Sequence, residues 1–279
     1  MDKTTLNNYL SESVSFLKER FSEFNAQIGI ILGSGLGPFV EKIQVINAIN
    51  TADIPHYPAS TVSGHSGRLV HGSVEGIEIF ALQGRVHTYE GYDQWQVTYP
   101  ARLMHLLGLR SLIVTNSSGS SNPDFRPGNF MLIRDHLDFI FRDPLYEWEL
   151  RDFGSVSPYN EEYISMAESV AKKLDMNLYE GVLSANLGPT YETPAEVKFQ
   201  MSLGGDTASM STFPEVTVAR SLGLKVLGLS VLTNYAAGLN KTPLNHKEVT
   251  EMADSVSDNF SILITELIKK INLLNKEGN

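Results

Sequence analysis

The sequence predicts an α/β fold, in which a mixed β-sheet is flanked by helices. Short apolar runs with the length of buried strands alternate with helical patterns along the chain. Two such runs are joined by a tight turn at Val74, Glu75 and Gly76, which predicts an antiparallel hairpin and excludes a uniformly parallel sheet. No linker rich in proline, glycine and serine divides the 279 residues, and there is neither an internal repeat nor a low-complexity segment. We therefore expect residues 1–279 to form a single domain.

Hydrophobic periodicity predicts the individual elements. A helix is expected near the start, where apolar residues recur every three to four positions from Tyr9 to Phe21. A long helix is expected near the end, where Asn245 can cap it and apolar residues from Val249 to Ile271 mark one face. Between 142 and 163 the pattern fails, and the aromatic residues there favour a lid or a subunit contact. The expected strands are 28–32, 68–71, 76–82, 111–115, 130–133, 181–184 and 225–233.

Composition argues against several classes of protein. The 22 Lys and Arg against 32 Asp and Glu give a net charge of −10, which disfavours nucleic acid or an anionic membrane as the main partner. No apolar run approaches the ~18 residues of a membrane span, and the first residues lack the pattern of a signal peptide. The chain has no cysteine, which suits the cytoplasm. Its seven histidines are scattered, so we expect no metal site.

The first chemical motif is a glycine-rich turn, Gly33 to Pro38, which follows the first expected strand and leads into a helix. Backbone N–H groups in such a turn and at a helix N-terminus suit a phosphate. A dinucleotide fingerprint would need a small residue in place of Pro38 and an acid about twenty residues further on. Asp53 is at that distance but lies in a turn-like segment. A purely structural turn and a nicotinamide site both remain open at this point.

Arg85 and His87 belong to a second motif, at 83–92. On an extended backbone, residues i and i+2 point to the same face, so this guanidinium and imidazole can form a clamp for an oxyanion. A further histidine and arginine, His65 and Arg68, stand amid glycines at 64–68. For either histidine taken alone, the ordinary alternative is a surface histidine without a functional role.

Polar loops also follow several other strands, at 114–123, 188–196, 208–215 and 229–238. Any one of them could be ordinary loop chemistry. Their recurrence at strand ends indicates one site assembled from several loops. From the residues alone, the chain is an α/β protein that binds a small phosphorylated or phosphate-using ligand.

The ordered set of motifs resembles the trimeric purine nucleoside phosphorylases of the nucleoside phosphorylase family, in their bacterial branch. The resemblance runs from about Gly29 to Val249 and is interrupted only in the 142–185 region. It depends on the segments 33–37, 65–70, 83–92, 131–136, 188–193, 210–215 and 233–234.

The resemblance implies an enzyme of purine salvage that cleaves a nucleoside with inorganic phosphate, without a metal, a cofactor or a covalent intermediate. Phosphate would be the co-substrate, and His87, Glu192 and Asn234 would be catalytic. The phosphate would be held by Ser34, His65, Arg85, His87, the backbone N–H of Ser117, and Ser211. The ribose would be lined by Tyr89, Met210 and His246, and the base would be bound by Tyr191, Glu192 and Asn234.

The resemblance also implies a homotrimer in which an aromatic residue of one subunit reaches its neighbour's ribose pocket. Phe153 is the first candidate, and Trp148 and Tyr159 are the alternatives.

Several departures from the family pattern bear on specificity. Ser118 and Ser209 stand where the family has alanine and glycine. Relatives that cleave methylthioadenosine carry aspartate at the position of Asn234, so 6-oxopurine nucleosides are favoured here. A tyrosine at the position of Tyr191 occurs in the xanthosine-cleaving relatives and also in ordinary bacterial members, so the sequence does not rank inosine, guanosine and xanthosine.

Four other functions remain as alternatives. Two belong to the same family, a xanthosine-preferring phosphorylase and a methylthioadenosine phosphorylase. The other two are a nicotinamide-dependent dehydrogenase and a nucleoside-binding protein without catalysis. Only Ser117, Ser118 and Ser209 support the non-catalytic binding protein.

Overall fold

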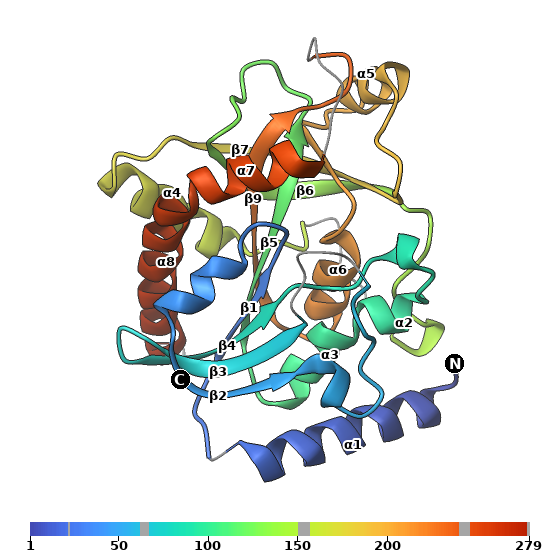
Figure 1. Ribbon diagram of the computed structural model, residues 1–279, viewed down its shortest axis with the longest axis vertical. Coiled ribbons are helices and arrows are strands. Elements are labelled where there is room, and N and C mark those ends of the chain that lie inside the picture. Colours follow the sequence, from blue (N-terminus) through green and yellow to red (C-terminus); the bar gives the residue numbers. More distant parts are fainter. Residues whose placement is uncertain (22, 62–66, 150–156, 240–245, 278–279) are drawn as a thin grey trace.

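A mixed sheet of nine strands runs through the centre of the computed structural model (Figure 1). The structure describes residues 1–279 except 22, 62–66, 150–156, 240–245 and 278–279, and for residues 246 and 247 it describes the backbone alone. The strand order is β2-β3-β4-β1-β5-β8-β7-β6-β9, and β9 also pairs with β5, which closes one end of the sheet into a ring. The strands are β1 (Ile28–Leu32), β2 (Gln44–Asn50), β3 (Arg68–Val74), β4 (Ile77–Gln83), β5 (Ser111–Ser120), β6 (Phe130–Phe139), β7 (Leu178–Asn186), β8 (Thr207–Ser209) and β9 (Lys225–Tyr235).

Strand direction brings the functional loops together. β1 is parallel to both β4 and β5, and β5 is parallel to β9. The carboxyl ends of these four strands therefore meet at one edge of the sheet, where sites of α/β proteins form. The pairs β2–β3, β3–β4, β5–β8 and β6–β9 are antiparallel, so the sheet is mixed as predicted.

Helices cover the sheet from both sides (Figure 1). α4 (Glu161–Lys173) packs against α8 (Ser257–Glu277) on one side, and α3 (Tyr99–Leu106) packs against α6 (Phe213–Ser221) on the other. α1 (Lys3–Arg20) lies against α3. The other helices are α2 (Gln94–Val97), α5 (Pro194–Ser202) and α7 (His246–Ser255), with the 3-10 helices η1 (Gly37–Lys42), η2 (Thr51–Asp53), η3 (Thr88–Glu90) and η4 (Glu147–Glu149).

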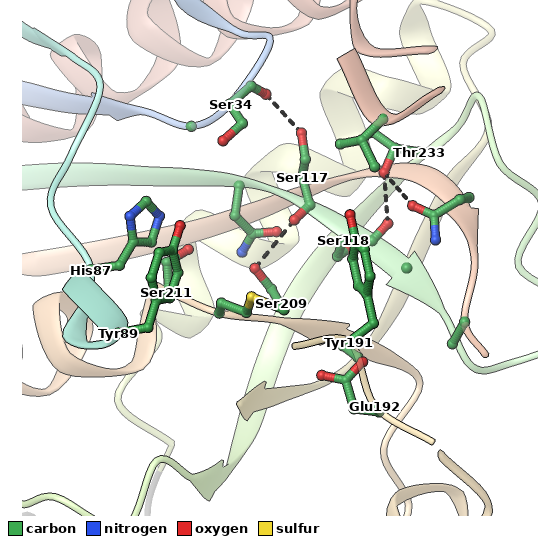
Figure 2. A pocket seen from close by; sticks show the side chains of 18 of the residues that line it. Ser34, His87, Tyr89, Ser117, Ser118, Tyr191, Glu192, Ser209, Ser211 and Thr233 are labelled. Carbon is green, nitrogen blue, oxygen red and sulfur yellow. Dashed lines mark hydrogen bonds between the residues drawn. The ribbon is translucent and has the colours of Figure 1, made fainter. Parts of the chain in front are cut away.

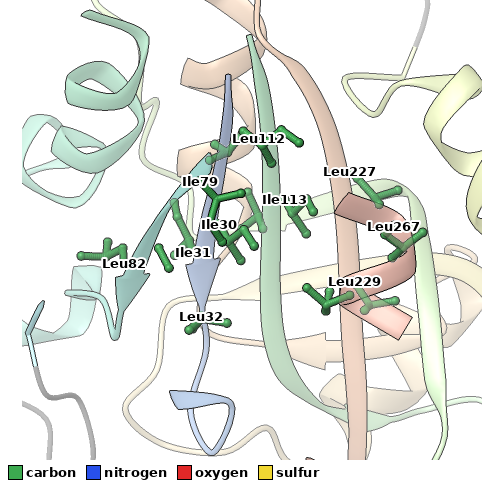
Figure 3. Close-up of a cluster of buried hydrophobic side chains, with 14 of the residues drawn as sticks. Ile30, Ile31, Leu32, Ile79, Leu82, Leu112, Ile113, Leu227, Leu229 and Leu267 are labelled. Carbon is green, nitrogen blue, oxygen red and sulfur yellow. The ribbon is translucent and has the colours of Figure 1, made fainter. Parts of the chain in front are cut away.

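The hydrophobic core explains why the central strands read as continuous apolar runs. All five residues of β1 are buried, because helices cover both faces of the sheet at this point. Figure 3 shows Ile30 of β1 beside Ile79 of β4 and Ile113 of β5, with Leu229 of β9 facing Leu267 of α8. This packing makes the strand ends a rigid base for the site.

The hairpin prediction is confirmed, and the turn chemistry explains it. β3 and β4 pair antiparallel with Val74 opposite Ile77. Glu75 and Gly76 between them have φ of 51° and 77°. Two consecutive positive φ angles are typical of the tight turns whose twist matches a hairpin.

The long C-terminal helix is the element that the sequence predicted wrongly. The chain forms two helices, α7 and α8, which are separated at Val256. α7 packs on β9, whereas α8 packs on α4, β1 and β4, so the two helices serve different neighbours. The proposed cap Asn245 lies outside the described residues. None of the helices in the described part of the chain is both long and apolar enough to cross a membrane.

Part of the unpatterned 142–163 segment is tied to the helices. Glu149 of η4 forms an ion pair with the buried Arg102 of α3. Tyr159 is 2% exposed and belongs to the main core, so it cannot serve a neighbouring subunit. Trp148 is exposed and stacks on Tyr146 with ring centroids 4.3 Å apart. Phe153, the first candidate, lies outside the described residues.

Candidate functional site

A cavity of about 120 Å³ opens where the carboxyl ends of β1, β4, β5 and β9 meet. It gathers ten of the twelve residues that the sequence predicted for the site. The other two, His65 and the side chain of His246, lie outside what the structure describes. The ten that line the cavity are Ser34, Arg85, His87, Tyr89, Ser117, Tyr191, Glu192, Met210, Ser211 and Asn234.

The cavity has two polar ends (Figure 2). His87, Tyr89 and Ser211 lie on one side of the view, and Tyr191 and Thr233 lie on the other. Ser117 and Ser209 are placed between these two groups. His87 and Ser211, which are expected at the phosphate, therefore lie apart in this view from Tyr191, which is expected at the base.

The glycine-rich turn packs directly against β5. The Ser117 hydroxyl donates to the Ser34 carbonyl oxygen at 2.7 Å, and the Gly33 N–H donates to Thr115 Oγ1 at 3.2 Å. A Cβ at Gly33 would come within 2.8 Å of the Asn116 Cα, so only glycine allows this approach. The helix expected after the turn is the six-residue 3-10 helix η1, whose N-terminus is preceded by Leu36 without a side-chain cap.

Arg85 is buried against a carboxylate that the sequence reading did not single out. Its Nη1 lies 3.2 Å from Glu215 Oε1, and the two side chains are 2% and 1% exposed. Its Nη2 also donates to the carbonyl oxygen of Thr115. Burial lowers the pKa of the Arg85 guanidinium, and the charge of Glu215 opposes this. Arginine stays protonated even so, which places a fixed positive charge at the cavity wall.

His87 is oriented by a second carboxylate. Its Nδ1 lies 3.0 Å from Glu90 Oε1, and the N–H and hydroxyl of Thr61 donate to Glu90 Oε2 at 2.8 and 2.6 Å. Burial opposes ionisation of Glu90, but the hydrogen bonds from His87 and Thr61 prevail and lower its pKa to about 2. The ionised Glu90 is an acceptor, so it favours the ring tautomer that carries its hydrogen on Nδ1.

Tyr89 lies beside His87 at the anion-binding end of the cavity (Figure 2). Its ring stacks on His87 with centroids 4.7 Å apart. Burial and the nearby Glu90 raise the pKa of Tyr89 to about 12, so the phenol remains neutral. A Cβ at Gly188 would lie 2.5 Å from Met210 Sδ and 2.9 Å from Tyr89 Cδ1, so a glycine is needed for these side chains to approach.

The Asn234 amide has a defined orientation. The Thr233 hydroxyl lies 2.8 Å from Asn234 Oδ1 and donates to it, and Asn234 Nδ2 donates to the Tyr235 carbonyl oxygen at 2.9 Å. An amide nitrogen carries two hydrogens, so one N–H remains to be offered to a ligand. A β-bulge at Ser118 and Gly119 brings Asn234 opposite Gly119 of β5.

Glu192 lies beside Tyr191 at the other end of the cavity (Figure 2). Burial and the charge of Glu196 raise the pKa of the Glu192 carboxyl group. Burial and Glu192 likewise raise the pKa of Tyr191. A carboxylate in such surroundings gains from a ligand N–H that satisfies it.

The two serines that depart from the family pattern have different surroundings. The Ser209 hydroxyl donates to the Ser117 carbonyl oxygen at 3.2 Å. The Ser118 Oγ is buried and has no hydrogen-bond partner among the described residues. Ser118 lines the cavity, so a ligand is a candidate partner for it.

Asp53, the acid considered for a dinucleotide, lies in η2 and does not line this cavity. The nicotinamide interpretation of the glycine-rich turn therefore lacks its ribose partner.

Sequence reasoning missed four residues that hold the site residues in place. Glu90, Thr212, Glu215 and Thr233 contact His87, Arg85 or Asn234. A signal for one pair was present, since a threonine followed three residues later by a glutamate is typical of a capping box. The Thr233 contact depends on side-chain geometry that no sequence pattern shows.

Comparisons with known proteins show the family to which the chain belongs. Residues 27–269 match the family model of the phosphorylase superfamily. The chain is 43% identical to purine nucleoside phosphorylase 1 of Bacillus subtilis (strain 168) over 264 residues, which cover 93% of this chain and 97% of the relative. It is 38% identical to the purine nucleoside phosphorylase of Bos taurus, over 90% of this chain and 91% of that one. The solved structure of isoform 2 of the Schistosoma mansoni purine nucleoside phosphorylase, in complex with cytosine and ribose-1-phosphate, has a TM-score of 0.85 at 36% identity, covering 94% of this chain and 95% of that chain.

Proposed function

The chain belongs to the phosphorylase superfamily and, within it, to the purine nucleoside phosphorylases, and on this premise we propose that it prefers 6-oxopurine nucleosides such as inosine and guanosine. It is an enzyme, and its substrates are small molecules. The observation that carries the proposed preference is the orientation of the Asn234 amide. The Thr233 donor fixes which end of the amide is the oxygen, and Nδ2 keeps one hydrogen for the base after it donates to Tyr235.

A 6-oxopurine fits that polarity. Its N7 and O6 are acceptors, whereas a 6-aminopurine presents an amino donor beside N7. Glu192 completes the match, because N1 carries a hydrogen in a 6-oxopurine and a lone pair in a 6-aminopurine. An ionised Glu192 would accept that N1–H at the opposite edge of the base.

The proposed reaction uses phosphate as the nucleophile. The phosphate is held below the ribose by Arg85, His87 and Ser211, together with Ser34, Ser117 and His65. A phosphate oxygen forms a bond to C1′ as the C1′–N9 bond breaks and its electron pair leaves with the base. The proton of hydrogen phosphate ends on the released purine. Asn234 stabilises the charge that develops on the base, and the phosphate stabilises that on the ribose, which is electrostatic catalysis. No cofactor enters this scheme.

Substrate comparison tests the preference. Initial rates with inosine, guanosine, xanthosine and adenosine at saturating phosphate should give a kcat/KM for inosine and guanosine at least about 10²-fold above that for adenosine. Glu192→Gln should lower the kcat/KM for inosine and leave the kcat/KM for adenosine unchanged. Asn234→Asp should raise the adenosine-to-inosine ratio. Equal values for adenosine and inosine in the unaltered enzyme would overturn the proposed preference while leaving phosphorolysis itself intact.

The proposal extends to assembly and location. We infer a homotrimer, supported by an exposed aromatic patch that we define as Phe139, Phe141 and Phe199. Phe141 and Phe199 are 79% and 58% exposed. The Phe139 ring lies 6.0 Å from that of Phe141 and 6.2 Å from that of Phe199. Exposed apolar clusters of this kind mark contact surfaces.

The absence of cysteine supports a cytoplasmic location.

A further inference from the structure

Thr212 has an unusual backbone at the anion-binding end of the cavity. Its φ is 81° and its ψ is −53°. The Phe213 N–H donates to the Ser211 carbonyl oxygen at 3.0 Å, which closes a three-residue turn with Thr212 at its centre. Turns of this hand are rare and strained, and a β-branched residue at positive φ is an outlier. A residue that begins a helix ordinarily has an extended backbone, so starting α6 does not require this conformation.

A buried carboxylate holds the strained residue in place. Glu215 Oε2 accepts the Thr212 N–H at 2.9 Å. Its other oxygen, Oε1, is the one that lies 3.2 Å from Arg85 Nη1. One carboxylate therefore links the backbone of Thr212 to the buried guanidinium.

The Thr212 hydroxyl connects three side chains. Asn116 Nδ2 donates to it at 2.8 Å and Arg85 Nη1 donates to it at 3.4 Å. Its oxygen also lies 3.4 Å from Ser211 Oγ. Because the two donors use both lone pairs, the single hydrogen of Thr212 is directed to Ser211. Ser211 then acts as an acceptor within the protein and can direct its own hydrogen into the cavity.

We propose that Thr212 is a positioning residue for the phosphate subsite. Its hydroxyl orients the hydroxyl hydrogen of Ser211 and the guanidinium of Arg85. The strained backbone, held by Glu215, is what places that hydroxyl between them. This inference rests on the proposed function, since it takes Arg85 and Ser211 as phosphate ligands.

The test compares Thr212→Val and Thr212→Ser. Valine keeps the shape and removes the hydroxyl, whereas serine keeps the hydroxyl. Phosphate KM is measured at saturating inosine, inosine KM at saturating phosphate, and inorganic phosphate binding to the free enzyme by calorimetry. Thr212→Val should raise the phosphate KM and dissociation constant at least about tenfold, with the inosine KM within about twofold of the original. Thr212→Ser should restore most of the phosphate affinity.

Two controls separate the possible failures. Thr98→Val removes another buried threonine hydroxyl, one that accepts from Arg102 Nε at 3.3 Å and does not line the cavity, and should leave the phosphate KM unchanged. Arg85→Ala tests the phosphate subsite itself. Suppose that Arg85→Ala raises the phosphate KM. If Thr212→Val then leaves the phosphate KM unchanged, or if Thr212→Val raises the phosphate KM and the inosine KM equally, the role of Thr212 is refuted and the proposed function stands.

If Arg85→Ala leaves the phosphate KM unchanged, the subsite is misplaced and the inference falls with it. Should Thr212→Val fail to fold, Thr212→Ala takes its place, with the same outcomes expected.

Discussion

Asn234 is positioned before any base binds, because Thr233 and Tyr235 of the same strand fix its amide through hydrogen bonds of 2.8 and 2.9 Å. His87 is held similarly by Glu90, and Arg85 by Glu215. Residues that touch the ligand are thus oriented by polar neighbours, which reduces the reorganisation required when charge develops in the reaction.

Substitution of Asn234 tests its part in catalysis. Asn234→Ala should reduce inosine turnover by about 10²–10³-fold, the usual scale for one lost transition-state donor, and should leave phosphate binding intact. The measurement is kcat for inosine together with phosphate affinity by calorimetry. Near-normal turnover in a folded Asn234→Ala enzyme would remove this amide from the mechanism.

At the scale of residues, the sequence predicted the side chains that face the cavity but not the neighbouring side chains that hold them in place. Arg85 and His87 were found because alternation along an extended backbone places them on one face, and both line the cavity. The roles of Tyr191, Glu192 and Asn234 came only from family resemblance. Glu215 escaped notice because its importance comes from burial beside Arg85, and burial of a charge cannot be read from local sequence.

Among the elements, η3 carries much of the anion-binding end, since it follows His87 and contains Tyr89 and Glu90. Glu90 also accepts two hydrogen bonds from Thr61, across a chain separation of 29 residues. The carboxylate therefore ties the segment before the glycine-rich stretch at 64–68 to the helical turn that presents His87.

Glu90 gives a pH-dependent stability prediction. Folding lowers its pKa from the ordinary value of 4.5 to about 2. Its stabilising effect is therefore present above about pH 4.5 and is lost as the pH falls toward 2. Urea unfolding at pH 7 should show Glu90→Gln to be less stable by about 1–3 kcal/mol.

That difference should narrow as the pH drops below 4.5. Glu266→Gln, which removes a carboxylate paired with Lys269 on α8, serves as the surface control and should have a smaller effect at pH 7. A difference that stays constant or widens at lower pH would contradict the proposed role of Glu90.

Elements that depend on local pattern were predicted well from the sequence. β1 has the predicted bounds, and part of each of β3 to β7 and β9 was found because buried strands are apolar runs. β2 was missed, since its side chains are largely exposed and carry no apolar run. β8 was missed because three residues are too few to form a pattern. The break between α7 and α8 reflects their different packing partners, which periodicity cannot show.

The whole molecule must bind a dianion while carrying a net charge of −10. Screening at physiological salt limits long-range repulsion to about 8 Å. Within the cavity, Arg85 supplies a fixed positive charge and Ser34, Ser117 and Ser211 supply polar groups. Local donors therefore determine phosphate capture more than the overall charge does.

Assembly gives the prediction at this scale. Size-exclusion chromatography with light scattering should give a mass about three times the 30.9 kDa of the chain. Phe141→Asp places a charge in the aromatic patch and should shift the mass toward that of the monomer. Leu273→Asp, at another exposed apolar position on α8, is the matched control and should leave the mass unchanged. A fully active monomer would contradict the inferred trimer.

Phosphate dependence of nucleoside cleavage tests the central claim most directly. The protein is incubated with inosine in phosphate-free buffer and with added inorganic phosphate, and both hypoxanthine and ribose 1-phosphate are quantified. The two products should form in equal amounts and only when phosphate is present. Release of hypoxanthine without phosphate, or no release in its presence, would contradict it.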